Sequence, residues 1–222
     1  MNLPASLFSN DFLWLANILF LALFIRAAKH AQWRKLLNNG IRFNALIGLI
    51  LGISLFWQLN AGIRPGFNFH LLGATLFVLM FGWRIALVIL TLVMLGTWTY
   101  SDLNPVSLGL NGLVMLAIPI IFSEWLLRIS QRYLPKNLFM FVLLNGFFCA
   151  GIAIAVMMAA TSLLLLWLTQ YTWAEIQYHY FIPAPILMFA ESFATGAMIT
   201  GFVVAQPEAV ENFSDKDYLE GK

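Results

Sequence analysis

Long apolar runs alternate with short polar segments along most of the chain. Apolar residues dominate six stretches, at 12–25, 43–59, 69–100, 106–127, 137–168 and 184–205. A helix needs about 20 predominantly apolar residues to cross the hydrocarbon core of a bilayer. The pattern therefore predicts a series of membrane-spanning helices joined by short polar turns.

The run at 69–100 is too long for one ordinary span and short for two. It is interrupted once, by Gly-Trp-Arg at 82–84. An arginine beside a tryptophan is typical of the boundary between membrane and water. We therefore predict two short helices with a turn at 82–84, which gives about seven membrane-spanning helices in an all-α integral membrane fold.

Basic residues are unevenly distributed among the turns. Five lie at 26–42, one is Arg84, three lie at 128–136, and the turns on the opposite side hold only Arg64. Turns rich in Lys and Arg remain in the cytoplasm. This bias places the N-terminus outside the cell and the C-terminus inside.

The composition supports the membrane assignment, because the chain is 61% hydrophobic and only 10% charged. So few charged residues would not cover the surface of a water-soluble protein of 222 residues. A net charge of +2, without a basic cluster among aromatic residues, gives no indication of nucleic-acid binding. The single cysteine, Cys149, excludes an internal disulfide and a cysteine-based metal site.

We expect residues 1–222 to form a single polytopic domain, with an acidic cytoplasmic tail at 206–222. The first residues lack the basic region and cleavage site of a secretory signal, so we expect Met1 to be the mature start. No P-loop, HExxH or GxSxG motif occurs, and we do not expect an enzyme.

Ionisable residues inside a membrane are costly to bury and are therefore candidates for function. Glu191 lies within the last apolar run, where it is either a packing residue that faces the bundle or a functional one. Glu124 stands four residues before Arg128, and this spacing indicates a helical ion pair. His70 begins the third run, as an interfacial residue or as a metal ligand. We interpret His30 as a solvated residue of the basic cytoplasmic loop and His179 as part of the interfacial aromatic belt.

Small residues on the second run are also candidates for function. Gly48 and Gly52 form a G-x-x-x-G pattern, which allows two helices to approach closely. The pattern fits packing within the bundle or docking of a partner helix.

Several segments together resemble one family. The segment that starts at His70 and continues to 95 resembles a block of the CbiM/NikM permeases, the substrate-binding components of energy-coupling-factor importers for cobalt and nickel. Gly109, Asn111 and Met115 resemble the G-x-N-x-x-x-M segment of that family, and the segment around Glu191 resembles its closing helix. The tail at 207–219 is also similar, so the resemblance covers nearly the whole chain.

The resemblance implies that the N-terminal segment, here 1–11, folds back toward a metal site. In the family, four nitrogens bind the metal: the terminal amine, the backbone nitrogen and imidazole of the second residue, and the histidine that matches His70. Asn111 and Glu191 are then candidates to support the ligands. Four nitrogens in one plane suit Ni²⁺, and similar sites suit Co²⁺.

This chain departs from the family at the second position, where Asn2 replaces the histidine. A carboxamide oxygen is a harder and weaker donor than imidazole. The expected ligands are therefore Met1 and His70, with Asn2 as a weak oxygen donor.

The sequence thus suggests a multi-pass permease component of the inner (cytoplasmic) membrane that takes up Ni²⁺ or Co²⁺ and holds no permanent cofactor. The resemblance implies a coupling transmembrane protein and ABC-type ATPases as separate partners. The alternative is a CbiM-like membrane protein without metal transport, which acts as a structural or assembly partner of another membrane complex.

Overall fold

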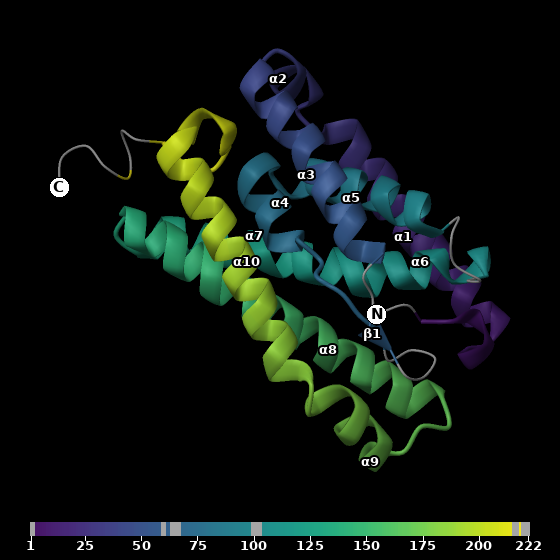
Figure 1. Cartoon of the computed structure of the whole chain (residues 1–222). Coiled ribbons are helices and arrows are strands. Elements are labelled where there is room, and N and C mark those ends of the chain that lie inside the picture. The colour runs from purple at the N-terminus through teal and green to yellow at the C-terminus, as the bar shows by residue number, and fades with distance from the viewer. Residues whose placement is uncertain (1–2, 59–60, 63–67, 99–103, 215–217, 219–222) are drawn as a thin grey trace.

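Helices make up nearly all of the chain in the computed structural model, which describes residues 3–58, 61–62, 68–98, 104–214 and 218 (Figure 1). The α-helices are α1 (Asn10–His30), α2 (Trp33–Leu37), α3 (Gly40–Gln58), α4 (Ala74–Phe81), α5 (Trp83–Trp98), α6 (Leu108–Asn111), α7 (Ile118–Tyr133), α8 (Cys149–Leu168), α9 (Trp173–Ile176) and α10 (Ala184–Ala205). Two short antiparallel strands, β1 (Ala61–Gly62) and β2 (Asn68–Phe69), pair Ala61 with Phe69.

Three π-helical and three 3₁₀ segments adjoin these helices. The π-helical ones are η3 (Gly112–Ala117), η4 (Met140–Phe148) and η5 (Gln177–Phe181). The 3₁₀ ones are η1 (Ala5–Leu7), η2 (Pro105–Ser107) and η6 (Pro207–Ala209). In the membrane each backbone group needs a partner within the protein, and the π-helical segments and η2 keep the helical hydrogen bonding continuous with the neighbouring α-helices.

Five helical stretches of the described chain are long and apolar enough to cross a membrane. They are Asn10–His30, Gly40–Gln58, Pro105–Tyr133, Met140–Leu168 and Trp173–Ala205. A shorter apolar helix, Trp83–Thr97, is a sixth. The short helix α4 occupies the place of the remaining predicted helix, but with eight residues it is too short to cross a membrane by itself. The all-α membrane fold is therefore confirmed.

The predicted turn at 82–84 is also confirmed. Gly82 separates α4 from α5 and has a φ angle of 79°. This left-handed conformation is open to glycine and strained for residues with a Cβ atom. The long apolar run is therefore divided by one glycine.

The short helix α4 forms the centre of the bundle, because all eight of its residues are buried. It contacts α5, α7, α8 and α10. Figure 1 shows α10 crossing the molecule diagonally, with α8 beside it. A helix surrounded in this way is shielded from both lipid and water.

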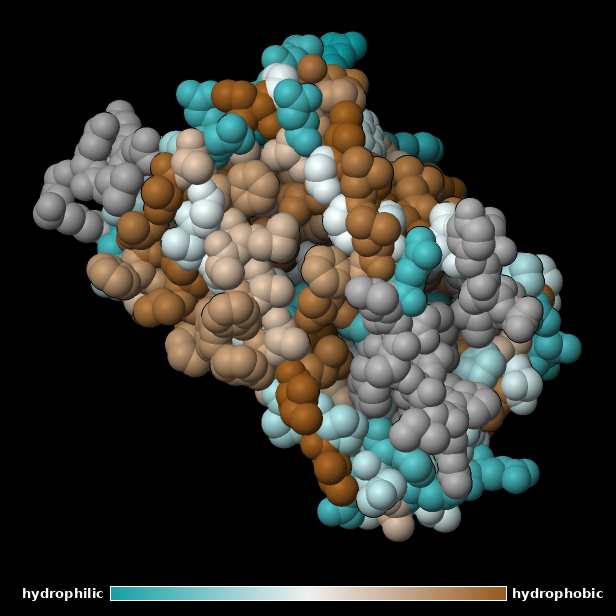
Figure 2. All heavy atoms as spheres, viewed as in Figure 1, coloured by the Kyte–Doolittle hydropathy of each residue, from teal (hydrophilic) through white to brown (hydrophobic). Residues whose placement is uncertain are grey.

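The outer surface is apolar between two polar ends, as expected for a membrane protein. Figure 2 shows brown and tan residues over α10 and α3, with teal regions over α2 and near α9. On α10, Ile186, Phe189 and Phe193 are 75%, 63% and 62% exposed. Such large exposed apolar side chains fit contact with lipid.

Basic residues from separate turns meet at one end, which we call the basic end. Lys35 and Arg42 both pair with Glu211 of the C-terminal segment, and Arg84 and Arg128 line a pocket that Glu211 also borders. The three basic segments of the sequence therefore share one side of the molecule. The positive-inside rule assigns this end to the cytoplasm.

Candidate metal site

His70 lies in the segment between β2 and α4, outside the membrane-spanning helices, and is only 6% exposed. Its Nδ1 is 3.2 Å from the carbonyl oxygen of Leu71, and its ring centroid is 5.0 Å from that of Trp57. In the tautomer with the proton on Nδ1, this contact is a hydrogen bond, and Nε2 keeps a free lone pair. Burial lowers the pKa of His70 well below its ordinary value, so the imidazole stays neutral, as a metal ligand requires.

Glu191 of α10 fixes the backbone that follows His70. Its carboxylate accepts hydrogen bonds from Leu72 N at 2.8 Å and Gly73 N at 2.7 Å. Gly73 has a φ angle of 68°, and a Cβ there would lie 2.9 Å from Cδ1 of Ile53. Glu191 therefore holds a turn that only glycine forms without strain, two residues after His70.

Asn111, the last residue of α6, holds the N-terminal segment. Its Oδ1 accepts a hydrogen bond from Leu3 N at 2.7 Å, and its Nδ2 donates to Leu3 O at 2.9 Å and to Ser107 O at 2.9 Å. Leu3 is fully buried. The side-chain amide thus satisfies both backbone groups of Leu3 within the bundle.

The structure gives no geometry for two of the predicted ligands, because Met1 and Asn2 lie outside the described residues. Within the part of the chain that is described, His, Cys, Asp and Glu side chains nowhere gather in a group of three that could hold a metal. Among the described residues, His70 therefore does not belong to a cluster of carboxylate, histidine or cysteine side chains.

Gly48 and Gly52 do not pack against another described part of the chain. A Cβ added to either would have no atom within 4 Å. Both line a groove of about 80 Å³ between α3 and α10, which also reaches Gly73 and Glu191. The G-x-x-x-G face is thus left open at the groove that borders the Glu191 turn.

The other charged candidates have local roles. Glu124 accepts a hydrogen bond from Nε of Arg128 at 2.8 Å, as the spacing predicted. His30 is exposed, with its Nδ1 2.9 Å from Arg26 O. His179 is half-buried with its ring 5.0 Å from that of Tyr178, far along the chain from the His70 segment.

Sequence reasoning missed two residues that shape the site. Trp57 covers the imidazole of His70, and among the described residues its buried Nε1 has no hydrogen-bond partner. Asn17 of α1 binds the segment before Asn111, with Nδ2 donating to Val106 O and Oδ1 accepting from Gly109 N. An asparagine in the middle of the first apolar run was a visible signal, whereas nothing in the sequence distinguishes Trp57 from other tryptophans.

Comparison with known protein families gives one match over most of the chain. The model of the family described as "cobalt uptake substrate-specific transmembrane region" matches residues 2–209. No match is found among curated proteins.

Two solved structures share the fold. The first, described as a truncated transition metal transporter, has a TM-score of 0.71 and 18% identity, and the match covers 92% of this chain and 98% of that one. The second, described as a transition metal transporter, has a TM-score of 0.70 and 18% identity, with 91% and 92% covered. At this identity the likeness shows the arrangement of the helices.

Proposed function

The chain belongs to the family of cobalt uptake substrate-specific transmembrane regions, and from this premise we propose that it binds Ni²⁺ or Co²⁺ for uptake across the inner membrane. Its fold is also that of transition metal transporters. The ion is the cargo, and it is held by residues that the bundle brings together.

The observation that carries this proposal is the buried imidazole of His70. It is held between the indole of Trp57 and a turn that Glu191 fixes through two backbone hydrogen bonds. Imidazole that is neutral and rigidly placed is the preferred ligand for Ni²⁺ and Co²⁺. We propose that its Nε2 is one donor, and that Glu191 supports it by fixing the chain direction at 72–73.

Met1 supplies the next donor in this proposal, through its terminal amine. Asn111 pins Leu3 through both of its backbone groups, and this contact limits how far the two preceding residues can extend. Two residues span at most about 7 Å. Asn111 therefore supports the site by anchoring the terminus, while Asn2 adds an oxygen donor weaker than the imidazole of other family members.

Uptake against a gradient requires energy that this chain does not provide, since its sequence carries no P-loop. We propose that separate ABC-type ATPases and a coupling transmembrane protein supply it. The basic end, which faces the cytoplasm, is the side on which such ATPases would act.

A second candidate function is that of a structural or assembly partner that binds no metal. Asn2 in place of histidine favours it, because one of four strong donors is lost. The open face of Gly48 and Gly52 also fits it, because a helix of another protein can approach there.

Metal binding by purified protein with a native, untagged N-terminus distinguishes the two functions. Ni²⁺ and Co²⁺ are titrated against wild type, His70→Ala and Asn2→His by calorimetry in detergent. His30→Ala is the matched control, because it removes an exposed histidine far from the site.

We expect micromolar or tighter binding by wild type that His70→Ala abolishes and His30→Ala retains, and we expect tighter Ni²⁺ binding by Asn2→His. Binding by Asn2→His alone would assign wild type to the second function with a disabled site. Absence of binding by every variant would refute the metal proposal.

A further inference from the structure

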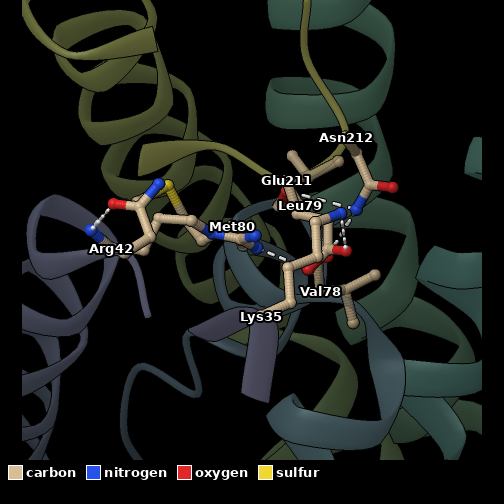
Figure 3. A network of polar contacts seen from close by, with 8 residues as sticks. Lys35, Arg42, Val78, Leu79, Met80, Glu211 and Asn212 are labelled. Atoms are coloured by element: carbon tan, nitrogen blue, oxygen red, sulfur yellow. Dashed lines mark hydrogen bonds and ion pairs between the residues drawn. The ribbon is translucent and has the colours of Figure 1, made fainter. Parts of the chain in front are cut away.

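The C-terminal segment folds back onto the end of α4 that lies farther from His70. Figure 3 shows Glu211 and Asn212 beside the last turn of α4. Glu211 N donates to Met80 O at 3.0 Å, and Asn212 Nδ2 donates to Val78 O at 3.0 Å and Leu79 O at 3.2 Å. We call Glu211 and Asn212, with their partners Lys35 and Arg42, the C-terminal clasp.

The carbonyl groups at the end of α4 need these donors. Val78 O already accepts from Gly82 N at 2.9 Å, but the helix stops at Gly82, and Leu79 O and Met80 O have no donor from a following turn. In an apolar interior an unpaired carbonyl is costly. The C-terminal clasp supplies the missing donors from a segment more than a hundred residues later in the chain.

Ionic contacts connect the same point to α2 and α3. The Glu211 carboxylate accepts from Lys35 Nζ at 2.9 Å and also from Nη2 of Arg42. Arg42 is only 3% exposed and donates a further hydrogen bond to Met80 O at 3.3 Å. A buried guanidinium that lost its carboxylate would be left with an uncompensated charge.

The other end of α4 is held by α10, the helix that continues into the C-terminal clasp. Glu191 accepts from Leu72 N and Gly73 N, immediately before α4. Gly73 and Gly82, both with positive φ, separate α4 from its neighbours at its two ends. Eight helical residues span about 12 Å, so α4 is a short rigid rod that is hydrogen-bonded to other parts of the chain at both ends.

We propose that the C-terminal clasp positions the His70 segment through α4, so that the cytoplasmic end of the protein regulates the metal site. Glu211 and Asn212 are then positioning residues for a ligand at the opposite end of the rod. A polar pocket of about 150 Å³, lined by Gln32, Arg84 and Arg128 among others, borders Glu211 and Asn212 and makes the clasp accessible from the cytoplasmic side. The metal-binding part of this inference rests on the proposed function.

The test compares variants of the C-terminal clasp by two readouts in detergent or nanodiscs. Glu211→Ala removes the carboxylate, and Asn212→Asp removes the Nδ2 donor without a change of size. The control is Glu208→Ala, which removes the same charge from an exposed position in the same tail. The first readout is hydrogen exchange of peptides over 70–82 without metal, and the second is the Kd for Ni²⁺.

Both clasp variants should exchange faster than wild type at 70–73, whereas Glu208→Ala should match wild type. Where wild type binds Ni²⁺, both variants should also bind it about tenfold more weakly. The loss of one or two hydrogen bonds at the clasp loosens α4, and only part of that loss reaches His70 at its other end. Should Glu211→Ala fail to fold, Glu211→Gln takes its place, because its side-chain oxygen still accepts from Arg42.

Unchanged exchange at 70–73 in folded clasp variants would overturn the proposal, because the clasp would then act only on its own end of α4. A uniform rise of exchange over the whole chain would also overturn it, since that is the result of general destabilisation. If wild type binds no metal and the clasp variants still loosen 70–73, the positioning role stands and the metal function fails.

Discussion

At the residue scale, Asn111 shows how one side chain fixes a non-helical backbone segment, at Leu3, inside a membrane protein. Its amide matches both the donor and the acceptor of Leu3, with distances of 2.7 and 2.9 Å. Backbone groups in an apolar interior have no water to bond to, so this pairing replaces the partner that a helix would provide.

Asn111→Leu keeps the number and branching of side-chain heavy atoms and removes both hydrogen bonds to Leu3, together with the one to Ser107 O. We expect the free energy of unfolding to fall by about 2–3 kcal/mol, because Leu3 N–H and C=O remain buried without partners. Thermal unfolding in detergent measures this loss, and an aminopeptidase should remove the first residues faster. Asn44→Leu, at an exposed position of α3, is the control and should change neither property. Equal unfolding temperatures for the two variants would contradict the role of Asn111.

The pKa of His70 makes stability depend on pH. Burial lowers the pKa in the folded protein, whereas the unfolded chain takes up a proton near the ordinary value of about 6.5. The unfolded state therefore binds more protons below that pH, and stability is complete above about pH 6.5 and decreases as the pH falls. Through this one group, the free energy of unfolding changes by at most about 1.4 kcal/mol per pH unit.

Unfolding of metal-free protein between pH 7.5 and 5.5 measures this slope. His70→Gln should flatten it, and His30→Gln should leave it unchanged because His30 is exposed. The same slope in His70→Gln as in wild type would show that other groups cause it.

The polar residues of the site were visible in the sequence, but their partners were not. Glu191 and His70 were selected because ionisable residues are rare in apolar runs. That Glu191 accepts from Leu72 and Gly73, 119 and 118 residues away, depends on how α10 packs beside α4. The roles of Met1 and Asn2 stay predictions.

At the element scale, the division of one apolar run into α4 and α5 could be predicted because Gly82 and Arg84 interrupt it. The π-helical segments could not be predicted: η3 and η4 lie within stretches whose hydrophobicity is continuous, and η5 lies in a polar and aromatic segment without a helical pattern. A π-helix differs from an α-helix by one residue in its hydrogen-bond spacing, and hydropathy does not record this difference.

Alanine substitutions at Gly73 and Gly82 test whether α4 needs a glycine at each of its ends. Alanine at either position adopts a positive φ at a cost of about 1–2 kcal/mol. Both substitutions should destabilise the protein for different reasons: the Cβ of Gly73→Ala also meets Ile53, whereas Gly82, with ψ of 156°, has a backbone conformation that essentially only glycine adopts. The free energy of unfolding in denaturant measures both.

Gly48→Ala is the control for these two variants, since Gly48 is helical and nothing lies within 4 Å of its added Cβ. We expect it to be neutral or to stabilise α3 by up to about 1 kcal/mol. A Gly73→Ala protein as stable as Gly48→Ala would mean that the turn before α4 relaxes without strain.

At the scale of the whole molecule, the unequal distribution of charge predicted which segments share one end. Lys35, Arg42 and Arg84 are distant in sequence, and all border the C-terminal segment in the structure. The return of Glu211 and Asn212 onto α4 was missed, because an acidic tail gives no sequence signal for the carbonyl groups it will meet.

The open face of α3 predicts where a membrane partner docks. Gly48 and Gly52 line a groove of about 80 Å³ between α3 and α10, and apolar surface surrounds it in Figure 2. Helices in membranes associate where small residues let backbones approach. Leucine at position 48 would fill the part of the groove that lies one helical turn before Gly52. The Glu191 turn borders the groove nearer to Ile53, so this leucine should not disturb it.

If the proposed coupling transmembrane protein binds at this groove, Gly48→Leu should lower its recovery in co-purification at least severalfold and leave the proposed binding of Ni²⁺ unchanged. Gly201→Leu is the control, because Gly201 is an exposed glycine of α10 that also has open space but does not line the groove. Equal loss of the partner from both variants would place the docking surface elsewhere. Wild-type protein that forms a dimer, together with Gly48→Leu protein that does not, would identify a second copy of this chain as the occupant of the groove. In that case Gly201→Leu should still form the dimer.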